Sequence, residues 1–370
     1  MKSDPIRILQ YIGSLNSGGS QSMIMEIYRK IDKNKIQFDF IIDRKDETLY
    51  ENEILKLGGK VYKFDNYLKG YNIIQFKKEW NDFLKKHKEY KIIHCHVRSV
   101  ASIVLKIAKK YDLTTICHSH STSNGSGFKA LVKKFLQKRI VKYADYLFAC
   151  SIDSAKWLYG EKMLQTNRCV IINNAIDTKK YLYNEETRNR VRKNLNLNDK
   201  IVLGQVGRLE EVKNYNFTID LISELVKRNP KYMLLIIGTG SLKDVIVDKI
   251  AKLNLKNNVL LLENRNDVNE LMQAMDVFLM PSLWEGLPLA LVEAQAASLP
   301  CIISENILDG ILVDDIVSKL NINLIDEWLK KIEEISSVLK TRKNFTEIIK
   351  NKGFDIENNV DIISKFYLSL

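Results

Sequence analysis

Short apolar runs alternate with helical patterns along this chain of 370 residues, and the alternation occurs in two rounds. Such alternation predicts βαβ units and a parallel sheet in each round. A chain of this length can bury two cores, so we expect two α/β domains. The runs of the first round start at Ile6, Phe38, Lys91, Thr114 and Tyr146, and those of the second start at Ile201, Tyr232, Val259, Val277 and Pro300.

The stretch from Glu285 to Glu293 carries two carboxylates, with a Gly-x-Pro elbow and an apolar run between them. The apolar run 277–280 is expected to enter this elbow as a strand, and Pro288 suits the first turn of the helix that follows. The first amides of that helix lack partners inside it, which makes an anion site. Amides for a diphosphate, one carboxylate for a ribose and one for a sugar together predict a nucleotide-sugar site.

Four motifs occur along the chain in the order of a known family. They are Gly18-Gly19 after the first strand, Asn-x-x-Asp at 174–177, Gly207-Arg208 followed by Lys213-Asn214, and E-x7-E at Glu285 and Glu293. The chain therefore resembles the retaining glycosyltransferases of family 4. The resemblance spans nearly the whole chain and is densest from about residue 170 to about residue 300.

This resemblance implies the GT-B architecture, an α/β fold in which two Rossmann-like domains face each other across a cleft. We predict an N-terminal domain of residues 1–178, joined by a C-terminal helix of about residues 355–370, and a nucleotide-sugar-binding domain of residues 179–354. The charged stretch 179–200 marks the change between them. Ligands of such sheets bind beyond the carboxyl ends of the strands.

Arg208 and Lys213 are implied by the resemblance to grip the diphosphate as negative charge builds on it. The chain lacks the Asp-x-Asp signature of metal-dependent transferases, and fixed cations can stabilise a leaving group in place of a metal. We therefore expect no metal and no cofactor, the nucleoside diphosphate sugar being the donor substrate. An isolated pair of this kind would instead be two solvated cations on a loop.

By the same resemblance Glu293 accepts hydrogen bonds from the ribose, and Glu285 faces the donor sugar. Glu285 is a chemically competent nucleophile, but the fold implies a front-face mechanism in which the leaving phosphate helps to deprotonate the acceptor. For Glu293 the alternative is a carboxylate that complements the helix dipole. Further donor contacts are expected at Gly238, near Arg265, and from the amides of Gly286, Leu287 and Leu289. Because Glu263 stands where the family carries glycine, the nucleobase is open, with UDP as the default.

In the first domain, Gly18 and Gly19 let the backbone approach a phosphate or an acceptor closely. His120 aligns with a family histidine that contacts the sugar or the diphosphate, and His118 aligns second. Such a histidine can donate to the leaving phosphate at neutral pH. Arg98 is expected either to grip an acceptor phosphate or to lie on the surface.

The histidines also allow an alternative role as metal ligands. Residues two apart on a strand share one face, so His94, His96, His118 and His120 could converge as zinc ligands. Strand-end histidines of α/β proteins are more often polar contacts, and closed structural sites usually show tighter cysteine spacing. We therefore predict no metal here.

Charge is spread unevenly: residues 1–200 carry a net charge of +17 and residues 201–370 carry −5. The basic half favours an anionic partner, although a generally lysine-rich composition explains it equally well. In the segment 128–142, six cations flank an apolar stripe at helical spacing. A basic amphipathic helix can lie on anionic lipid, which would make a lipid-linked saccharide the acceptor, whereas the alternative is an ordinary surface helix.

These features predict a cytoplasmic, metal-independent glycosyltransferase for a surface or capsular polysaccharide, with peripheral binding to the inner face of the membrane. No apolar run reaches the ~20 residues that span a bilayer, and the five cysteines indicate reduced, buried thiols. One alternative is a GT-B-shaped sugar-nucleotide epimerase, but no set of acid and base residues stands out for it. The other is a nucleic-acid-binding protein, which would interleave aromatics with cations. The aromatic residues here follow core periodicity, so we expect no nucleic acid.

Overall fold

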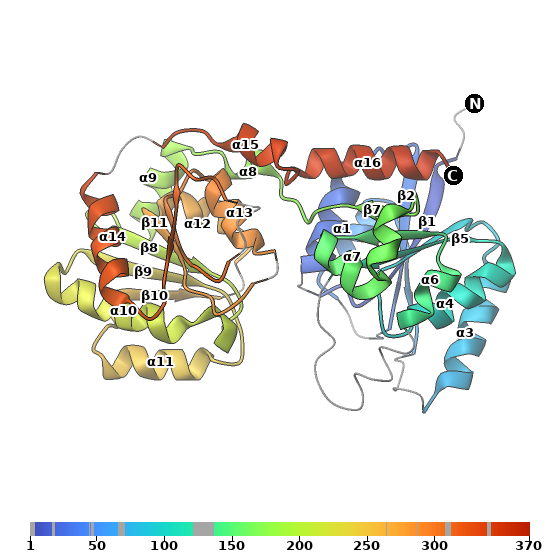
Figure 1. Ribbon diagram of the computed structural model, residues 1–370, viewed down its shortest axis with the longest axis horizontal. Helices are drawn as coiled ribbons and strands as arrows, with labels where there is room; N and C mark the ends of the chain where they lie inside the picture. The colour runs from blue at the N-terminus through green and yellow to red at the C-terminus, as the bar shows by residue number, and fades with distance from the viewer. Residues whose placement is uncertain are drawn as a thin grey trace. The chain divides into compact units, whose positions relative to one another are not determined.

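The computed structural model describes residues 4–16, 19–43, 45, 48–65, 71–120, 137–263, 265–285, 287–307, 312–338 and 342–370. The chain folds into two compact units (Figure 1). Unit 1 comprises Met1–Ala175 and Ile356–Leu370, and unit 2 comprises Ile176–Asp355. The first boundary lies three residues before the predicted one, because Ile176 already pairs with Asp355 in a parallel bridge.

Unit 1 is built on a parallel sheet with the strand order β3-β2-β1-β4-β5-β6-β7. Its strands are β1 (Ile6–Gly13), β2 (Ile36–Ile42), β3 (Val61–Lys63), β4 (Ile92–Cys95), β5 (Thr114–Ser119), β6 (Tyr146–Ala149) and β7 (Cys169–Ile171). Its helices are α1 (Gly19–Lys30), α2 (Glu51–Lys56), α3 (Ile73–Lys86), α4 (Ala101–Ala108), α6 (Ile140–Tyr143), α7 (Ile152–Tyr159) and α16 (Ile356–Leu368).

Unit 2 repeats the plan with the strand order β10-β9-β8-β11-β12-β13, again parallel. Its strands are β8 (Ile201–Val206), β9 (Tyr232–Ile237), β10 (Val259–Leu262), β11 (Val277–Met280), β12 (Cys301–Ser304) and β13 (Val317–Leu320). Its helices are α8 (Thr178–Tyr181), α9 (Glu185–Asn194), α10 (Tyr215–Arg228), α11 (Lys243–Lys252), α12 (Val268–Ala274), α13 (Leu289–Ala296), α14 (Ile325–Ser337) and α15 (Thr346–Asn351).

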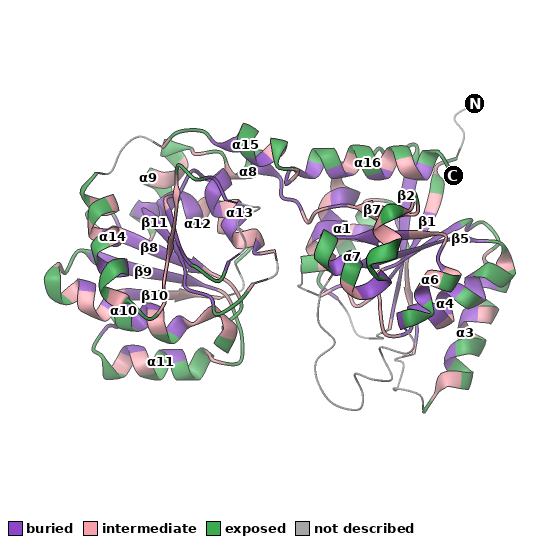
Figure 2. Cartoon of the chain, viewed as in Figure 1, coloured by how far each residue is buried: buried purple, intermediate pink, exposed green. Residues whose placement is uncertain are grey.

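The central strands of both sheets are buried, and helices cover their two faces (Figure 2). Strands covered on both faces need continuous apolar runs, which the sequence supplies. All five cysteines are free, and four of them are buried, as predicted. Within the described part of the chain, no helix combines the length and the apolar character that crossing a bilayer requires.

Helix α16 returns to unit 1 and completes its core, as the resemblance implied. The hydroxyl of Tyr367 lies 2.5 Å from His94 Nδ1 and accepts a hydrogen bond of 3.3 Å from Gln10 Nε2. The ring of Phe366 meets that of Phe148 edge-on at 4.9 Å. Residues separated by most of the sequence therefore pack in one core.

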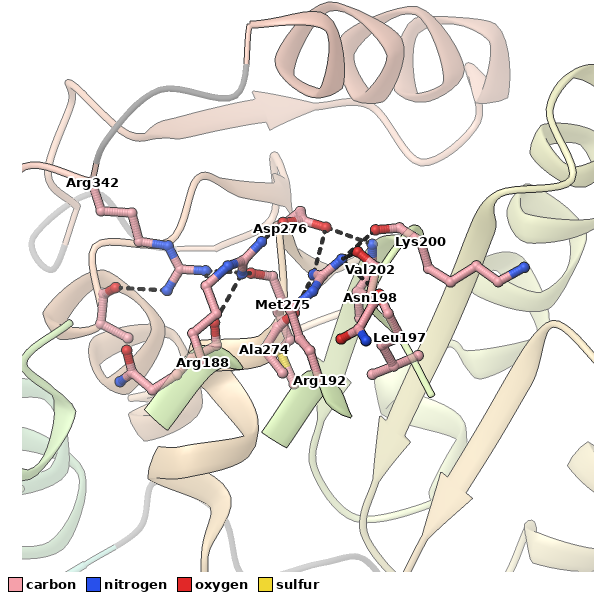
Figure 3. A network of polar contacts seen from close by, with 12 residues as sticks. Arg188, Arg192, Leu197, Asn198, Lys200, Val202, Ala274, Met275, Asp276 and Arg342 are labelled. Atoms are coloured by element: carbon pink, nitrogen blue, oxygen red, sulfur yellow. Dashed lines mark hydrogen bonds and ion pairs between the residues drawn. The ribbon is translucent and has the colours of Figure 1, made fainter. Parts of the chain in front are cut away.

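Three arginines surround Asp276 inside unit 2 (Figure 3). Arg188 Nη2 lies 2.5 Å from Asp276 Oδ1, and Arg192 Nη1 lies 3.2 Å from Oδ2, which also accepts a 2.8 Å bond from the amide of Val202. Arg342 instead donates to backbone carbonyls, among them that of Ala297 at 3.2 Å. Burial and the charge of Arg188 lower the pKa of Arg342 to about 10. This network ties α9 to the start of β8 and to the segment that leads into β11.

Asp43 provides a test of pH-dependent stability. Its Oδ2 accepts a 2.7 Å hydrogen bond from Tyr11, whereas Oδ1 is buried with no partner among the described residues. Burial raises the pKa of Asp43 to about 6, helped by the charge of Glu79 and opposed by the Tyr11 hydrogen bond. A carboxyl group whose pKa is raised on folding makes the protein lose stability as pH rises from the unfolded pKa to the folded one.

Asp43→Asn is therefore expected to remove a loss of about 2 kcal/mol between about pH 4 and about pH 6. Urea unfolding of both proteins at several pH values measures this. As the pH rises through this window, the free energy of unfolding of Asp43→Asn should increase relative to that of the wild type, and the difference should persist above pH 6. The exposed Asp361→Asn should show the same pH dependence as the wild type. Parallel pH profiles for wild type and Asp43→Asn would contradict the assignment.

Candidate functional site

A charged pair lies at the carboxyl edge of the sheet of unit 2. Lys213 follows β8 and Glu285 follows β11, and these two strands are neighbours. The Nζ atom of Lys213 lies 2.5 Å from Glu285 Oε1, and the Ser282 hydroxyl donates to the same oxygen at 2.7 Å. The Lys213 and Glu285 side chains are only 16% and 11% exposed. Two sequence motifs that lie 72 residues apart thus meet at one point.

Neutral hydrogen bonds hold the two loops that carry this pair. Asn214 adopts a left-handed conformation, with φ of 55°, and its Nδ2 donates to the carbonyl of Pro281 at 3.1 Å. The amide of Leu283 donates to the carbonyl of Val212 at 2.9 Å. Gln205, on β8, donates to the carbonyl of Lys213 at 2.7 Å. The pair is therefore preorganised by backbone contacts, which a catalytic electrostatic site requires.

The ends of β8 and β9 approach each other too closely for a side chain. Gly238 has a φ of +153°, and a Cβ placed on it would lie 1.9 Å from the carbonyl oxygen of Gly207. That same carbonyl accepts a 2.8 Å hydrogen bond from the Tyr215 hydroxyl. Gly238 is thus required by the packing of the strand ends, beside the loop that carries Arg208.

Gly238→Ala is expected to lower the free energy of unfolding by about 2–4 kcal/mol, because a clash adds to an unfavourable φ. Thermal or urea unfolding measures the loss. Gly19→Ala is the control, since a Cβ there would meet nothing within 4 Å. A Gly238→Ala protein as stable as that control would show that the strand ends can separate.

The other residues predicted for donor binding lie near this edge by topology. Arg208 directly follows Gly207 and is exposed, and Glu293 is the half-buried fifth residue of α13. Helix α13 begins at Leu289 with Pro288 as its N-cap, so the proline lies one residue before the first turn predicted for it. Leu287 is half-buried in the loop before this helix, whereas Gly286 lies outside the described residues.

Arg265 lies on the loop that follows β10, and its side chain is exposed. Its Nε donates to Asp267 Oδ1 at 2.7 Å. The guanidinium is therefore engaged within its own loop, and a contact between the backbone of this loop and the nucleobase stays a prediction. Sequence reasoning did not single out Gln205 or Tyr215, because neither belongs to a recognisable motif.

The four strand-end histidines of unit 1 form one histidine cluster: His94, His96, His118 and His120. Ring centroids lie 4.1–5.4 Å apart, and the rings are stacked except for the tilted pair of His96 and His118. His96 Nδ1 lies 2.8 Å from His120 Nε2. Burial and the charge of Arg98 lower the pKa of His120 to about 3, and burial also lowers the pKa of the other three well below the ordinary range. The imidazoles are therefore neutral at physiological pH.

The remaining predicted residues of unit 1 have varied positions. His118 is fully buried and His120 is half-buried, so only His120 is partly open to a substrate. Arg98 is half-buried, and its guanidinium lies over the Trp157 ring, 5.2 Å from the centroid, so it is not a free surface cation. Gly19 opens α1, and a Cβ added to it would meet no described atom within 4 Å, whereas Gly18 lies outside the described residues.

The segment 128–142 is described only from residue 137 onward. In that part, α6 packs against α4, and Ile140 is fully buried in the core of unit 1. Lys138, Arg139 and Lys142 are more exposed. The apolar side of the described part is thus used by the core, and the rest of the predicted basic helix lies outside the described residues.

Two family models match the chain, one in each unit. Glycosyltransferase Family 4 matches residues 17–180, and Glycosyl transferases group 1 matches residues 186–352. EpsF of Bacillus subtilis (strain 168), which is named as a glycosyltransferase, is 31% identical over 375 residues, or 99% of this chain and 97% of EpsF. The chain belongs to the glycosyltransferases.

Among other relatives, the chain is similar to the Escherichia coli UDP-Gal:alpha-D-GlcNAc-diphosphoundecaprenol alpha-1,3-galactosyltransferase, with 30% identity over 78% of this chain and 77% of that protein. The solved structure of Anabaena HepE in complex with UDP and glucose matches with a TM-score of 0.77 at 17% identity, over 99% of this chain and all (100%) of that one. The fold is GT-B, with two Rossmann-like domains, as predicted. Neither the epimerase nor the nucleic-acid-binding alternative gains support from these matches.

Proposed function

We propose that the protein is a retaining glycosyltransferase that moves one sugar from a UDP-sugar to a lipid-linked saccharide acceptor during surface polysaccharide synthesis. The observation that supports this most is the Lys213–Glu285 pair at the carboxyl edge of β8 and β11. It sets a cation for a diphosphate beside a carboxylate for a sugar, where ligands of parallel sheets bind.

In this proposal, Lys213 and Arg208 neutralise the charge that develops on the departing diphosphate, which removes the need for a catalytic metal. The amides at the start of α13 add to this anion site, with Leu287 and Leu289 at its rim. Glu293 binds the ribose and Glu285 the sugar. Ser282 fixes one oxygen of Glu285 and leaves the other for a sugar hydroxyl. His120 contacts the sugar or the leaving phosphate from unit 1.

The names of relatives support the substrate classes. The Escherichia coli relative is named for UDP-Gal, for a diphosphoundecaprenol acceptor and for an alpha-1,3 linkage. A Campylobacter jejuni relative, 29% identical over 62% of both chains, is named as a diphospho-undecaprenol 4-alpha-N-acetylgalactosaminyltransferase. A Staphylococcus aureus relative is named for capsular polysaccharide biosynthesis. By analogy, the acceptor here carries a polyprenyl diphosphate, and the protein works at the inner face of the membrane.

Thermal shift with UDP- and GDP-sugars tests the donor site. A UDP-sugar should raise the Tm of the wild type, and it should raise the Tm of Lys213→Ala and Glu293→Ala much less. Glu224→Ala, which alters only an exposed ion pair on α10, is the matched control. Equal stabilisation of all four proteins would show that these residues do not bind the donor.

Turnover assays test the mechanism. The new linkage should be α by NMR, and the rate should not change when Mg²⁺ or Mn²⁺ is added. A β product or a rate that depends on either ion would refute the retaining or the metal-independent part of the proposal.

Co-sedimentation with anionic vesicles tests binding to the membrane. The fraction of protein that sediments should fall when the cations between Lys129 and Lys142 are replaced. Binding that depends neither on lipid charge nor on these cations would rule out the lipid surface.

A further inference from the structure

Three members of the histidine cluster bring their ring nitrogens together. His94, His96 and His118 each offer one nitrogen, and these nitrogens all lie within 4.8 Å of one another. His94 lies on β4, His96 directly follows that strand, and His118 lies on β5. Strands β4 and β5 are paired neighbours in the sheet. The ring centroids of His94 lie 4.3 Å from His96 and 5.3 Å from His118. Adjacent strands thus place three imidazoles on one face of the sheet.

Several of these nitrogens lack a partner within the described structure. Nε2 of His94 and both ring nitrogens of His118 are buried without a hydrogen bond. A neutral imidazole carries one N–H and one lone pair, so each buried ring should find a partner for both. Leaving such groups unsatisfied costs about 1–3 kcal/mol each. The cluster therefore has the free lone pairs that a ligand would satisfy.

Two of the rings already have the outer contacts that metal-bound histidines use. Nδ1 of His94 lies 2.5 Å from the Tyr367 hydroxyl, which orients the ring and leaves Nε2 toward the cluster. Nε2 of His96 lies 2.8 Å from Gln10 Oε1, so with the proton on Nε2 the lone pair is on Nδ1. That lone pair faces His120 Nε2 at 2.8 Å, a contact that the bound ion would replace. A histidine that binds a metal usually donates its other ring N–H to an oxygen in this way.

We propose that His94, His96 and His118 bind one Zn²⁺ ion, with a water molecule as the fourth ligand. Zinc prefers four-coordinate sites, and neutral imidazole is one of its usual ligands. Zinc–nitrogen bonds of about 2.0–2.1 Å place tetrahedral ligand atoms about 3.4 Å apart, so the rings must close in by about 1 Å on binding. The ion ties β4 to β5 and, through Tyr367, to α16, and this structural role goes beyond the proposed sugar transfer.

The test uses the full-length protein without an affinity tag, stripped with a chelator and then titrated with Zn²⁺ by calorimetry. The wild type should bind one equivalent, and Co²⁺ in its place should give the visible absorption of a tetrahedral site. His118→Leu should weaken binding by at least 100-fold, and Gln10→Leu, which removes only an outer contact, by about 10–100-fold. The chain has five histidines, so His87, at the end of α3, is the matched control, and His87→Gln should bind as the wild type does.

Folding does not obscure the outcome, because both ring nitrogens of the fully buried His118 lack a partner, so leucine removes no hydrogen bond of the described structure. With chelator present, the Tm of His118→Leu should lie within a few degrees of the wild-type Tm. Added Zn²⁺ should raise the Tm of the wild type but not that of His118→Leu. The proposal is overturned if the wild type binds no stoichiometric zinc, if His118→Leu binds as tightly, or if His87→Gln abolishes binding. Weak binding that is equal in every variant would identify an adventitious ion only and would overturn it as well.

Discussion

Lys213→Ala is expected to lower kcat/KM for sugar transfer by about 10²–10³-fold, the loss typical when one preorganised charge is removed from a site of developing negative charge. Lys213 Nζ already lies at the sheet edge, 2.5 Å from Glu285. Its loss removes the cation from the leaving diphosphate and leaves Glu285 without its counter-charge. Initial rates of UDP release, with the donor that thermal shift identifies, measure the effect, and Lys213→Arg should recover part of the rate because it restores a cation.

Lys227→Ala is the matched control for this experiment. Lys227 is an exposed lysine of unit 2, paired with Glu224 on α10 at 2.6 Å, and its removal should leave the rate unchanged. Unfolding curves of all variants separate a loss of charge from a loss of structure. If Lys213→Ala is folded and keeps more than a tenth of the wild-type kcat/KM, Lys213 does not stabilise the leaving group.

Asp276→Ala is expected to lower the free energy of unfolding by about 3–5 kcal/mol, because it leaves buried cations without their counter-charge. Asp276 is almost fully buried, and it is the carboxylate that pairs with both Arg188 and Arg192. The amide of Val202 loses its acceptor as well. Urea unfolding measures the change. The free energy of unfolding of Asp276→Asn should lie between those of the wild type and Asp276→Ala, because asparagine can keep the hydrogen bond while losing the charge.

Glu270→Ala provides the contrast. Glu270 on α12 pairs with Arg190 on α9 at 3.0 Å, but the Arg190 side chain is 54% exposed. Exposed ion pairs contribute about 0–1 kcal/mol, so this variant should lie within 1 kcal/mol of the wild type. Similar values for Asp276→Ala and Glu270→Ala would mean that the buried network relaxes or admits water.

The sequence predicted the central strands of both sheets and the edge strand β10 but missed the other three edge strands. The predicted strands are continuous apolar runs, as expected for strands covered on both faces. Strands β3, β7 and β13 lie at sheet edges, and their residues are only half-buried. An edge strand needs less apolar character, so its pattern resembles that of a loop. These three edge strands thus depend on tertiary pairing, whereas the apolar run of β10 made that edge strand predictable.

The members of the candidate site could be named from motifs, but their contacts could not. Lys213 and Glu285 were assigned separate roles, and their pairing follows only from the neighbouring positions of β8 and β11. Alternation along a strand placed His94 beside His96, yet their convergence with His118 depends on β4 pairing with β5. Tyr367, which orients His94, lies 273 residues further along the chain. Such distant partners leave no local signal.

The position of α16 affects the order in which the two units mature on the ribosome. Unit 1 contains the first 175 residues, but Ile356, Ile363 and Tyr367 of α16 fill part of its core. Domains generally fold as units while synthesis proceeds. Here all of unit 2 is synthesised before the closing helix of unit 1 has been made. Unit 1 therefore cannot complete its core until unit 2 has been synthesised, and the apolar residues that α16 covers stay exposed until then.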